Sequence, residues 1–440
     1  MENYSENQYF ERDLLKELKK WIDRKEIIAI KGPRQAGKTT LLRMLERWLE
    51  EEKRVSPEHI SFLTFEDRDL QDKFSQDPKT FLRSLLPPKT GGRFYLFIDE
   101  FQYAQDGGQK LKLLYDTFEN VKFIISGSSS LELTGKTAKF LVGRVFSFSL
   151  WQLSFGEFLR VKAPQLFRMY QEKVPALQGF IQEGKQFSLS SQDIFEKDFK
   201  LEFEDYAIWG GYPEVVKARD EETKRIVLKN IYDTYISRDI IELLRMADYS
   251  HLKTLVELLA VQTGNLVNYT GLAQDTKSYF KEIKRYLTIL EETFVISLLR
   301  PFSTNKATEL KKNPKVYFID TGLRNYILRN TQGLSLRADA GQIVESAILA
   351  QLKKRIRGEY TMKYWRTLGG AEVDFILELE GELVPLEVKY STLSAAQISR
   401  SFHSFLAEYK PKRGLVLTKG FWGKKRVGKT EILFAPVWYM

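Results

Sequence analysis

The sequence predicts an α/β protein built on a parallel sheet, with further modules behind it. Apolar segments alternate with amphipathic segments in the N-terminal third, and such alternation is typical of parallel strands joined by covering helices. The segments expected as strands are 27–30, 60–65, 94–98 and 122–125, and those expected as helices are 39–50 and 110–119. A chain of 440 residues has room for about three domains, each with its own core.

Composition excludes several classes of protein. Hydrophobic residues make up 43% of the chain and charged residues 29%, as in packed soluble proteins. The absence of cysteine excludes disulfide scaffolds and sulfur-ligated metals, and three histidines leave a metal mainly to oxygen ligands. No apolar run approaches the roughly 20 residues that cross a bilayer, and the N-terminus has no secretion-signal pattern. We therefore expect a cytoplasmic protein with no membrane partner.

A phosphate-binding loop follows the first expected strand. The segment GPRQAGKTT matches G-x-x-x-x-G-K-T, and a helical pattern comes after it. In this setting the loop N–H groups and the helix N-terminus bind phosphate, Lys38 contacts the β and γ phosphates, and the Thr39 hydroxyl ligates Mg²⁺. The sequence therefore predicts ATP and Mg²⁺ as ligands. The expected nucleotide-binding residues are Gly32, Pro33, Arg34, Gln35, Ala36, Gly37, Lys38, Thr39 and Thr40.

The same pattern occurs a second time, as GKKRVGKT at 423–430. The run that follows it, 432–435, is strand-like, so no helix N-terminus is available to bind a phosphate. We do not expect a nucleotide site there.

Two adjacent carboxylates end the apolar strand 94–98. Asp99 is expected to bind the Mg²⁺ that accompanies ATP, and Glu100 to act on the attacking water. The next strand leads to Ser126, whose hydroxyl is expected to sense the γ-phosphate. Arg144 has two interpretations: a catalytic arginine that acts on the nucleotide of a neighbouring subunit, or an ordinary surface arginine.

Eight short motifs are spread along nearly the whole chain. They are GPRQAGKTT (32–40), DEFQ (99–102), SGSSSLEL (126–133), GR (143–144), LSFGEF (153–158), GGYPEVV (210–216), SRDI (237–240) and YFIDTGL (317–323). Together they resemble the prokaryotic AAA-type P-loop ATPases that carry a C-terminal PD-(D/E)xK nuclease-like domain of unknown function. The resemblance implies a homo-oligomer, a hexameric ring by analogy, and places Arg238 where a second sensor arginine is common.

This resemblance and the patterning together predict five segments. They are an AAA+ ATPase core (1–155), a helical lid (156–250), a winged-helix module (251–322), a connector (323–340) and a mixed α/β restriction-endonuclease-like domain (341–440).

The winged-helix prediction rests on a helix with two unlike faces. Residues at spacings of three and four are expected to face inward, namely Phe280, Ile283, Leu287, Leu290 and Phe294. The opposite face carries Lys277, Lys281, Lys284 and Arg285. A shorter helix near 271–274 precedes it, and segments 294–299 and 316–319 are expected as a hairpin, an order in which the second helix enters the major groove of DNA. Two alternatives stay open: the lysines only solvate the helix, or the module contacts protein.

Positive charge is concentrated near the C-terminus. Residues 341–440 hold sixteen Lys and Arg against ten Asp and Glu, which is +6 of the total +10. The stretch 409–430 has eight basic residues and no acidic one, with Phe421 and Trp422 among them. Cations that neutralise phosphates would stand beside rings that stack on bases, so Lys424, Lys425 and Arg426 are expected to contact DNA. A solvated loop is the alternative.

Carboxylates in the last hundred residues resemble the PD-(D/E)xK nuclease core. Glu345 lies in a helical pattern, while Asp374 and Glu387 are expected on neighbouring strands of a hairpin, with Lys389 on the same face as Glu387. Such a set holds Mg²⁺ or Mn²⁺ and activates water against a phosphodiester. Val373 stands where the family often has proline, so a fold without cleavage stays open.

Three functions follow from these patterns. The first is an ATP-hydrolysing machine that recognises or remodels DNA, including branched DNA, through its winged-helix and nuclease-like domains. The second is a nucleotide-switched signalling or scaffold ATPase that contacts proteins. The third is a metal-dependent DNA nuclease regulated by ATP.

Overall fold

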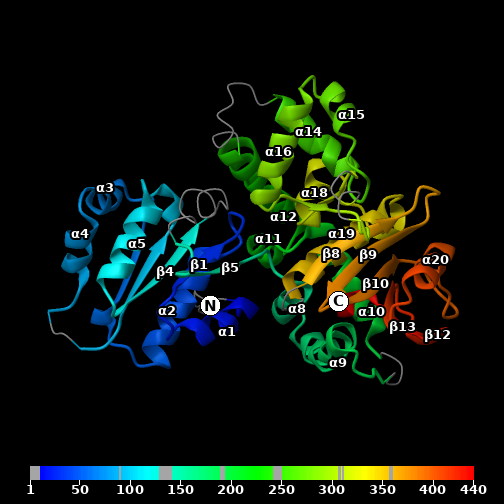
Figure 1. Ribbon diagram of the computed structural model, residues 1–440, viewed down its shortest axis with the longest axis horizontal. Helices are drawn as coiled ribbons and strands as arrows, with labels where there is room; N and C mark the ends of the chain where they lie inside the picture. Colours follow the sequence, from blue (N-terminus) through cyan, green and yellow to red (C-terminus); the bar gives the residue numbers. More distant parts are fainter. Residues whose placement is uncertain are drawn as a thin grey trace. The chain divides into compact units, whose positions relative to one another are not determined.

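The computed structural model describes residues 10–88, 91–127, 141–188, 194–240, 250–305, 309, 312–355 and 360–440. The chain divides into two compact units (Figure 1). The first comprises residues up to Leu153 with 292–294, and the second comprises 154–291 and 295–440. The search of the described helices for a long apolar segment that would cross a membrane finds no candidate.

The first unit contains a five-stranded parallel sheet in the order β2-β3-β4-β1-β5. Its strands are β1 (Ile27–Lys31), β2 (Ile60–Thr64), β3 (Phe94–Asp99), β4 (Val121–Gly127) and β5 (Val145–Ser149). The four predicted strands are confirmed, and β5 is an edge strand that the sequence pattern did not indicate. Because all five strands are parallel, their carboxyl ends share one edge of the sheet.

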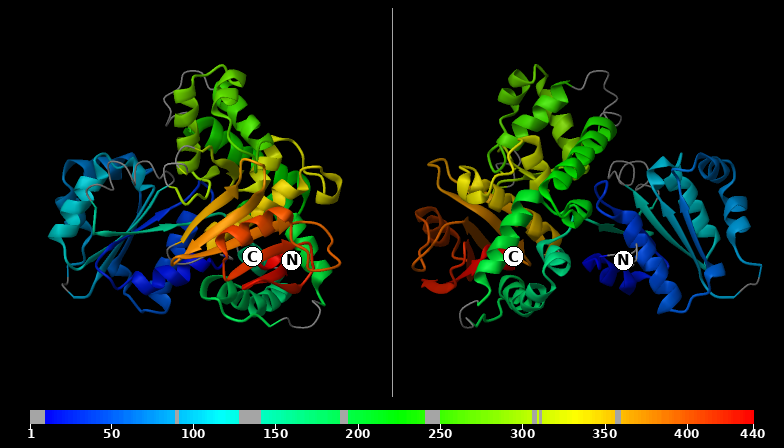
Figure 2. Two further views of the ribbon diagram at one scale, coloured as in Figure 1. Left: turned by 45° about the vertical axis from the view of Figure 1, so that its right-hand side comes forward. Right: turned by 180° about the vertical axis from the view of Figure 1, so that it is seen from behind.

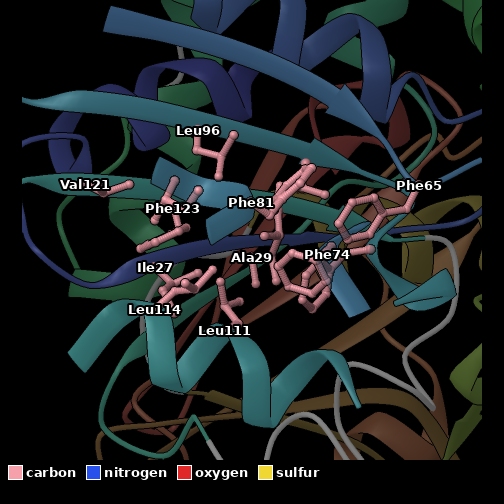
Figure 3. Close-up of a cluster of buried hydrophobic side chains, with 14 of the residues drawn as sticks. Ile27, Ala29, Phe65, Phe74, Phe81, Leu96, Leu111, Leu114, Val121 and Phe123 are labelled. Carbon is pink, nitrogen blue, oxygen red and sulfur yellow. The ribbon is translucent and has the colours of Figure 1, made fainter. Parts of the chain in front are cut away.

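Helices cover both faces of this sheet. They are α1 (Asp13–Trp21), α2 (Lys38–Glu51), α3 (Arg68–Gln76), α4 (Pro78–Leu85) and α5 (Gly107–Thr117). Alternate residues of β1 belong to two hydrophobic clusters, with Ile27 and Ala29 in one and Ile28 and Ile30 in the other. Figure 3 shows the first cluster, where α5 supplies apolar side chains beside those of β1. This two-sided burial explains why the strands are continuous apolar runs.

The second unit begins with a group of helices. They are α8 (Phe155–Lys162), α9 (Pro164–Glu183), α10 (Glu196–Trp209), α11 (Pro213–Lys217) and α12 (Glu221–Ile231), followed by the π-helix η3 (Tyr232–Asp239). In the LSFGEF motif, Ser154 and Glu157 form a capping box that starts α8. These helices were predicted as a lid, yet they pack within the second unit: α10 contacts α18 (Thr321–Ile327) and α19 (Ala340–Arg355), and α9 contacts β11 (Arg413–Thr418).

Two motifs of the family resemblance, GGYPEVV and YFIDTGL, meet in this unit. The carboxylate of Asp320 accepts hydrogen bonds from the N–H groups of Gly211, at 2.8 Å, and Leu323, at 2.9 Å. A Cβ atom on Gly322 would lie 1.9 Å from the carbonyl oxygen of Trp209. The two motifs therefore form one joint, in which a glycine is required for close backbone approach.

Three helices and a small antiparallel sheet come next in the chain. They are α14 (Ser250–Val261), α15 (Tyr269–Asp275), α16 (Phe280–Glu292), β6 (Ile296–Leu299) and β7 (Lys315–Phe318). The helices lie together at one end of the second unit, green to yellow-green in Figure 2. Ile283, Leu287 and Leu290 are buried as predicted, but the prediction for Phe280 is wrong: this side chain is 49% exposed because it begins the helix.

A six-stranded mixed sheet completes the second unit, in the order β12-β13-β11-β10-β9-β8. Its elements are β8 (Tyr360–Arg366), β9 (Glu372–Leu379), β10 (Glu382–Lys389), α20 (Arg400–Tyr409), β11, β12 (Gly423–Val427) and β13 (Thr430–Pro436). Strand β11 is parallel to β10 and β13, and the other pairs are antiparallel. The predicted hairpin of Asp374 and Glu387 is the β9–β10 pair.

Candidate nucleotide-binding site and nucleic-acid interface

The phosphate-binding loop joins β1 to α2 and is held in a narrow space. A Cβ atom on Gly32 would lie 2.1 Å from the Leu150 carbonyl oxygen, and Gly37 has a φ of +91°, so both positions favour glycine. The buried guanidinium of Arg12 donates to the carbonyl oxygens of Ala36, at 2.7 Å, and Trp151, at 2.6 Å. Sequence reasoning missed Arg12, because no local pattern connects it to the loop.

Lys38 and Thr39 begin α2 and face the ends of neighbouring strands. The Lys38 ammonium is buried and donates to the carbonyl oxygens of Gly32, at 3.2 Å, and Pro33, at 3.1 Å. The Thr39 hydroxyl donates to Asp99 Oδ2 at 2.5 Å, and the Ser126 hydroxyl donates to Asp99 Oδ1. The structure therefore brings Lys38, Thr39, Asp99 and Ser126 together at the carboxyl edge of the sheet. This donor set fits ATP with Mg²⁺.

Glu100 follows Asp99 in an unusual backbone conformation. Its φ of +51° and ψ of +43° lie in the left-handed region, which non-glycine residues rarely adopt and which often marks functional sites. The Glu100 carboxylate accepts a hydrogen bond from the side-chain amide of Gln102, the last residue of the DEFQ motif. Gln102 thus orients the expected catalytic carboxylate, a role that the sequence alone did not indicate.

Arg144 lies at the amino ends of the strands, opposite the carboxyl ends, where Lys38, Thr39, Asp99 and Ser126 lie. It precedes β5, and Val145 pairs with Ile27 at the start of β1, so Arg144 stands at the amino edge. Its guanidinium forms an ion pair with Asp116, at 2.9 and 3.3 Å. Arg144 is therefore too far from the phosphate-binding loop of its own subunit to act on the nucleotide there. Its action on the nucleotide of a neighbouring subunit stays a prediction. The SGSSSLEL motif beyond Gly127 lies outside the described residues, as does the side chain of Arg238.

The basic residues predicted on this helix are exposed, and two exposed aromatic residues lie among them. Lys277, predicted on the helix face, and Tyr279 instead precede α16, which begins at Phe280. The α16 surface consists of Lys277, Tyr279, Phe280, Lys281, Lys284 and Arg285. Tyr279 is 78% exposed. The Lys284 ammonium lies 4.7 Å from the ring centre of Phe280. Cations and exposed aromatic residues are thus adjacent here, an arrangement that was expected for the C-terminal basic stretch.

The aromatic residues of that C-terminal stretch are half-buried and contact other rings of the protein. Trp422 stacks on Phe187, with ring centres 5.4 Å apart and planes 11° apart, and Phe421 packs against Phe434. These contacts within the protein compete with the predicted stacking of Trp422 and Phe421 on bases, which stays a prediction. Of the predicted DNA-binding residues, Lys424 forms an ion pair with Glu431 at 2.9 Å. Lys425 is partly exposed and Arg426 is exposed.

The second match to the phosphate-binding pattern forms a hairpin. Residues 423–427 and 430–436 are the antiparallel strands β12 and β13, and Gly428 has a φ of +58° in the turn between them. The strand expected after this match is confirmed as β13, so no helix N-terminus stands at this loop.

The carboxylates of the predicted nuclease site do not assemble as expected. Pairing of Leu386 with Phe375 puts Asp374 and Glu387 at facing positions of β9 and β10, and Lys389 lies 4.0 Å from Glu387. Glu345, however, accepts a hydrogen bond from Tyr317 and forms an ion pair with Lys315. Among the described side chains no group of three or more ligands could hold a metal ion. The predicted Mg²⁺ or Mn²⁺ set of Glu345, Asp374 and Glu387 is therefore not present in this arrangement.

The environment changes the acidity of these groups. Burial and the neighbouring Glu345 carboxylate raise the pKa of Asp374 well above its usual range, although Val388 N–H donates to it at 2.7 Å. Burial also raises the pKa of Glu387, against the opposing effects of Lys389 and Ser399.

Three family models match successive parts of the chain. Residues 24–159 match a model described as AAA domain. The N-terminal unit is an AAA-type P-loop domain. Residues 200–333 match a domain of unknown function, DUF8612, and residues 340–438 match another, DUF4143. The AAA domain implies ATP binding. The predicted order of an AAA-type ATPase domain followed by a C-terminal domain of unknown function is confirmed, whereas the nuclease-like character of the C-terminal domain stays a prediction.

The chain is also similar along most of its length to proteins from other organisms. It is 25% identical to an uncharacterized protein of Haemophilus influenzae, with 97% of each chain covered. It is 26% identical to one of Mycobacterium tuberculosis, covering 93% of this chain and 80% of that protein. Among solved structures, the ORC2 protein of Aeropyrum pernix is 13% identical with a TM-score of 0.36, covering 72% of this chain and 91% of that one. A TM-score of this size does not establish a shared overall fold.

Proposed function

We propose that this protein hydrolyses ATP in its AAA domain and that the nucleotide state controls how its second unit binds DNA. The observation that carries the proposal is the cluster of Lys38, Thr39, Asp99 and Ser126 at the carboxyl edge of the sheet. Here Thr39 and Asp99 would hold Mg²⁺, which supplies positive charge to the phosphates when bound. Lys38 would exchange its loop carbonyl partners for phosphate oxygens.

Glu100 is the proposed general base of the hydrolysis. A carboxylate next to the metal-binding Asp99 is suited to take a proton from water. The hydrogen bond from Gln102 restricts the orientation of this carboxylate. Ser126, bound to Asp99, would keep that carboxylate turned toward Thr39.

Arg144 is proposed to act on the nucleotide of a neighbouring subunit in a homo-oligomer. Its position at the amino edge supports this proposal, because it is remote from the Lys38 of its own sheet. We expect an Arg144→Ala protein to lose ATPase activity by about 10²-fold or more. Mixed with a Lys38→Ala protein, it should regain part of that activity, because a mixed interface joins an intact loop to an intact arginine.

Two controls accompany the mixing experiment. Asp116→Ala removes the partner of Arg144 within the subunit but should leave activity largely intact. The ATPase activity of each variant and of each mixture is measured as steady-state phosphate release. Mixtures no more active than the sum of their components would contradict action between subunits.

DNA is the proposed partner of the α16 surface. The surface combines exposed lysines with the exposed rings of Tyr279 and Phe280. Lysines neutralise phosphates, and open aromatic faces stack on unpaired bases. The order of α14, α15, α16, β6 and β7 supports a winged-helix interpretation, in which the second helix of the motif contacts DNA.

Charge reversal on α16 should weaken DNA binding in a salt-dependent way. For Lys281→Glu with Lys284→Glu, we expect affinity to fall at least about tenfold at moderate salt, and the slope of log affinity against log salt to fall by about 2. Fluorescence anisotropy with duplex, branched and single-stranded DNA measures both. Tyr279→Ala should weaken binding to single strands and branch points more than to duplex.

The control for the DNA experiment is Lys253→Glu, since Lys253 is an exposed lysine of α14 on the same module. It should retain the salt slope of the unaltered protein. Equal DNA affinity in the presence of ATP analogue, ADP and no nucleotide would contradict control by nucleotide state. No measurable DNA affinity would favour the nucleotide-switched scaffold that contacts proteins.

A further inference from the structure

The C-terminal sheet encloses a buried lysine among its carboxylates. Lys315 is the first residue of β7 and is only 2% exposed. Its ammonium lies 3.4 Å from Glu345 Oε1 of α19 and also contacts Glu372 of β9. The ring centre of Tyr364 in β8 lies 5.8 Å from the same ammonium. A strand from one module thus inserts a cation among elements of another.

A second side chain of β7 contacts the same carboxylate. Tyr317 lies two residues beyond Lys315, on the same face of the strand, and its buried hydroxyl donates to Glu345 Oε1. Its ring is 6.1 Å from that of Phe375 in β9. Glu345, the predicted helical metal ligand, therefore already receives one ammonium and one hydroxyl from β7.

The charges in this pocket support an ammonium at Lys315. Burial alone would lower the pKa of Lys315, but the carboxylates of Glu345 and Glu372 outweigh burial and raise it. Arg366 binds Glu372 at 3.1 Å from the more exposed side. Lys315 is thus the buried cation of this cluster, paired with Glu345 and Glu372.

We propose that the ammonium of Lys315 is the resident cation of the pocket formed by Glu345, Glu372 and Asp374, in the role that a divalent metal has in a nuclease. Glu345 and Asp374, two of the three expected metal ligands, then belong to a joint that fixes β7, and with it the β6–β7 hairpin beside α16, to the C-terminal sheet. The inference concerns the contact between the DUF8612 region, which contains Lys315, and the DUF4143 region, which contains the carboxylates, and it stands apart from ATP hydrolysis.

The first test is a manganese titration of the full-length protein without nucleotide. Because the pocket has its own cation, we expect the calorimetric binding curves of the unaltered protein and of Asp374→Asn to coincide. Manganese binding by the unaltered protein that Asp374→Asn removes would overturn the proposal. This measurement does not depend on the folding of a Lys315 variant.

The second test removes the ammonium. Loss of one partner from a buried ion pair is strongly destabilising, so Lys315→Met should lower the melting temperature by about 10 °C. Adding Glu345→Gln should raise it again, because that change removes the carboxylate left unpaired. A Lys315→Met protein that melts like the unaltered protein, or one that Glu345→Gln does not restabilise, would contradict the proposal.

A matched control uses a second buried lysine, which lies in strand β8 of the six-stranded sheet. Lys363 is 6% exposed and lies 2.9 Å from Glu309 and 2.8 Å from Glu378. Lys363→Met should also lower the melting temperature, but Glu345→Gln should not restore it. Recovery in this background would show a general effect of Glu345 rather than pairing with Lys315.

Discussion

Replacement of Lys38 by alanine is expected to reduce ATP hydrolysis by about 10²- to 10³-fold, because it removes the ammonium that would contact the phosphates where charge develops. Lys38 is buried against the loop carbonyl oxygens of Gly32 and Pro33, and its loss removes the hydrogen bond to each of them. ATP affinity should fall as well. A phosphate-release assay and binding of a fluorescent ATP analogue measure the two effects.

Glu100→Gln separates hydrolysis from binding. Removing a general base should cost about 10²- to 10⁴-fold in rate, while the loop, Lys38 and Thr39 remain to bind ATP. Lys53→Ala is a suitable control, since its ammonium is paired with Asp23 and it has no part in the proposed site. Full turnover by either Lys38→Ala or Glu100→Gln would refute the assignment of the site.

Substitution of Gly322 by alanine is expected to destabilise the second unit by about 3 kcal/mol or more, at the upper end of overpacking effects. The new Cβ atom would lie 1.9 Å from the Trp209 carbonyl oxygen and 2.8 Å from the Gly210 nitrogen, and backbone atoms cannot rotate away as a side chain can. The joint between Asp320 and Gly211 would open as a result. Urea denaturation followed by tryptophan fluorescence measures the change.

Gly341→Ala is the matched control for that experiment. Gly341 lies in α19, and a Cβ atom there would meet no atom within 4 Å. Because alanine is the better helix former, stability should stay the same or rise by up to about 1 kcal/mol. Equal stability of Gly322→Ala and Gly341→Ala would show that the joint tolerates movement of α18.

Elements with a clear local pattern of apolar residues, either an unbroken run or a helical spacing, were predictable from the sequence. The strands β1 and β3 are almost entirely apolar, and β4 is apolar up to Ser126 apart from the buried Lys122, because both faces of the sheet are buried. Helix α16 shows the spacing of an amphipathic helix, but the inward position of Phe280 was wrong, because periodicity does not reveal where the packed part of a helix begins. Strand β5 was missed, since its partly exposed residues give no apolar run.

The residues of the candidate nucleotide site were predicted more completely than those of the other candidate sites. Its residues stand at fixed distances from strand ends, and parallel strands bring those ends to one edge. The rings of Phe421 and Trp422 were assigned to DNA because exposure cannot be read from neighbouring residues. The same limit applies to Glu345, whose partners Lys315 and Tyr317 come from another module.

By itself, the sequence determined the phosphate-binding loop, the carboxylates that follow β3, and the amphipathic and basic character of α16. Tertiary structure alone decided that Arg12 fixes the loop, that Arg144 stands at the far edge of the sheet, and that an ammonium lies among the C-terminal carboxylates. The physical reason is that local motifs depend on backbone geometry within a few residues, whereas charge pairing and burial depend on which distant segments the fold brings into contact.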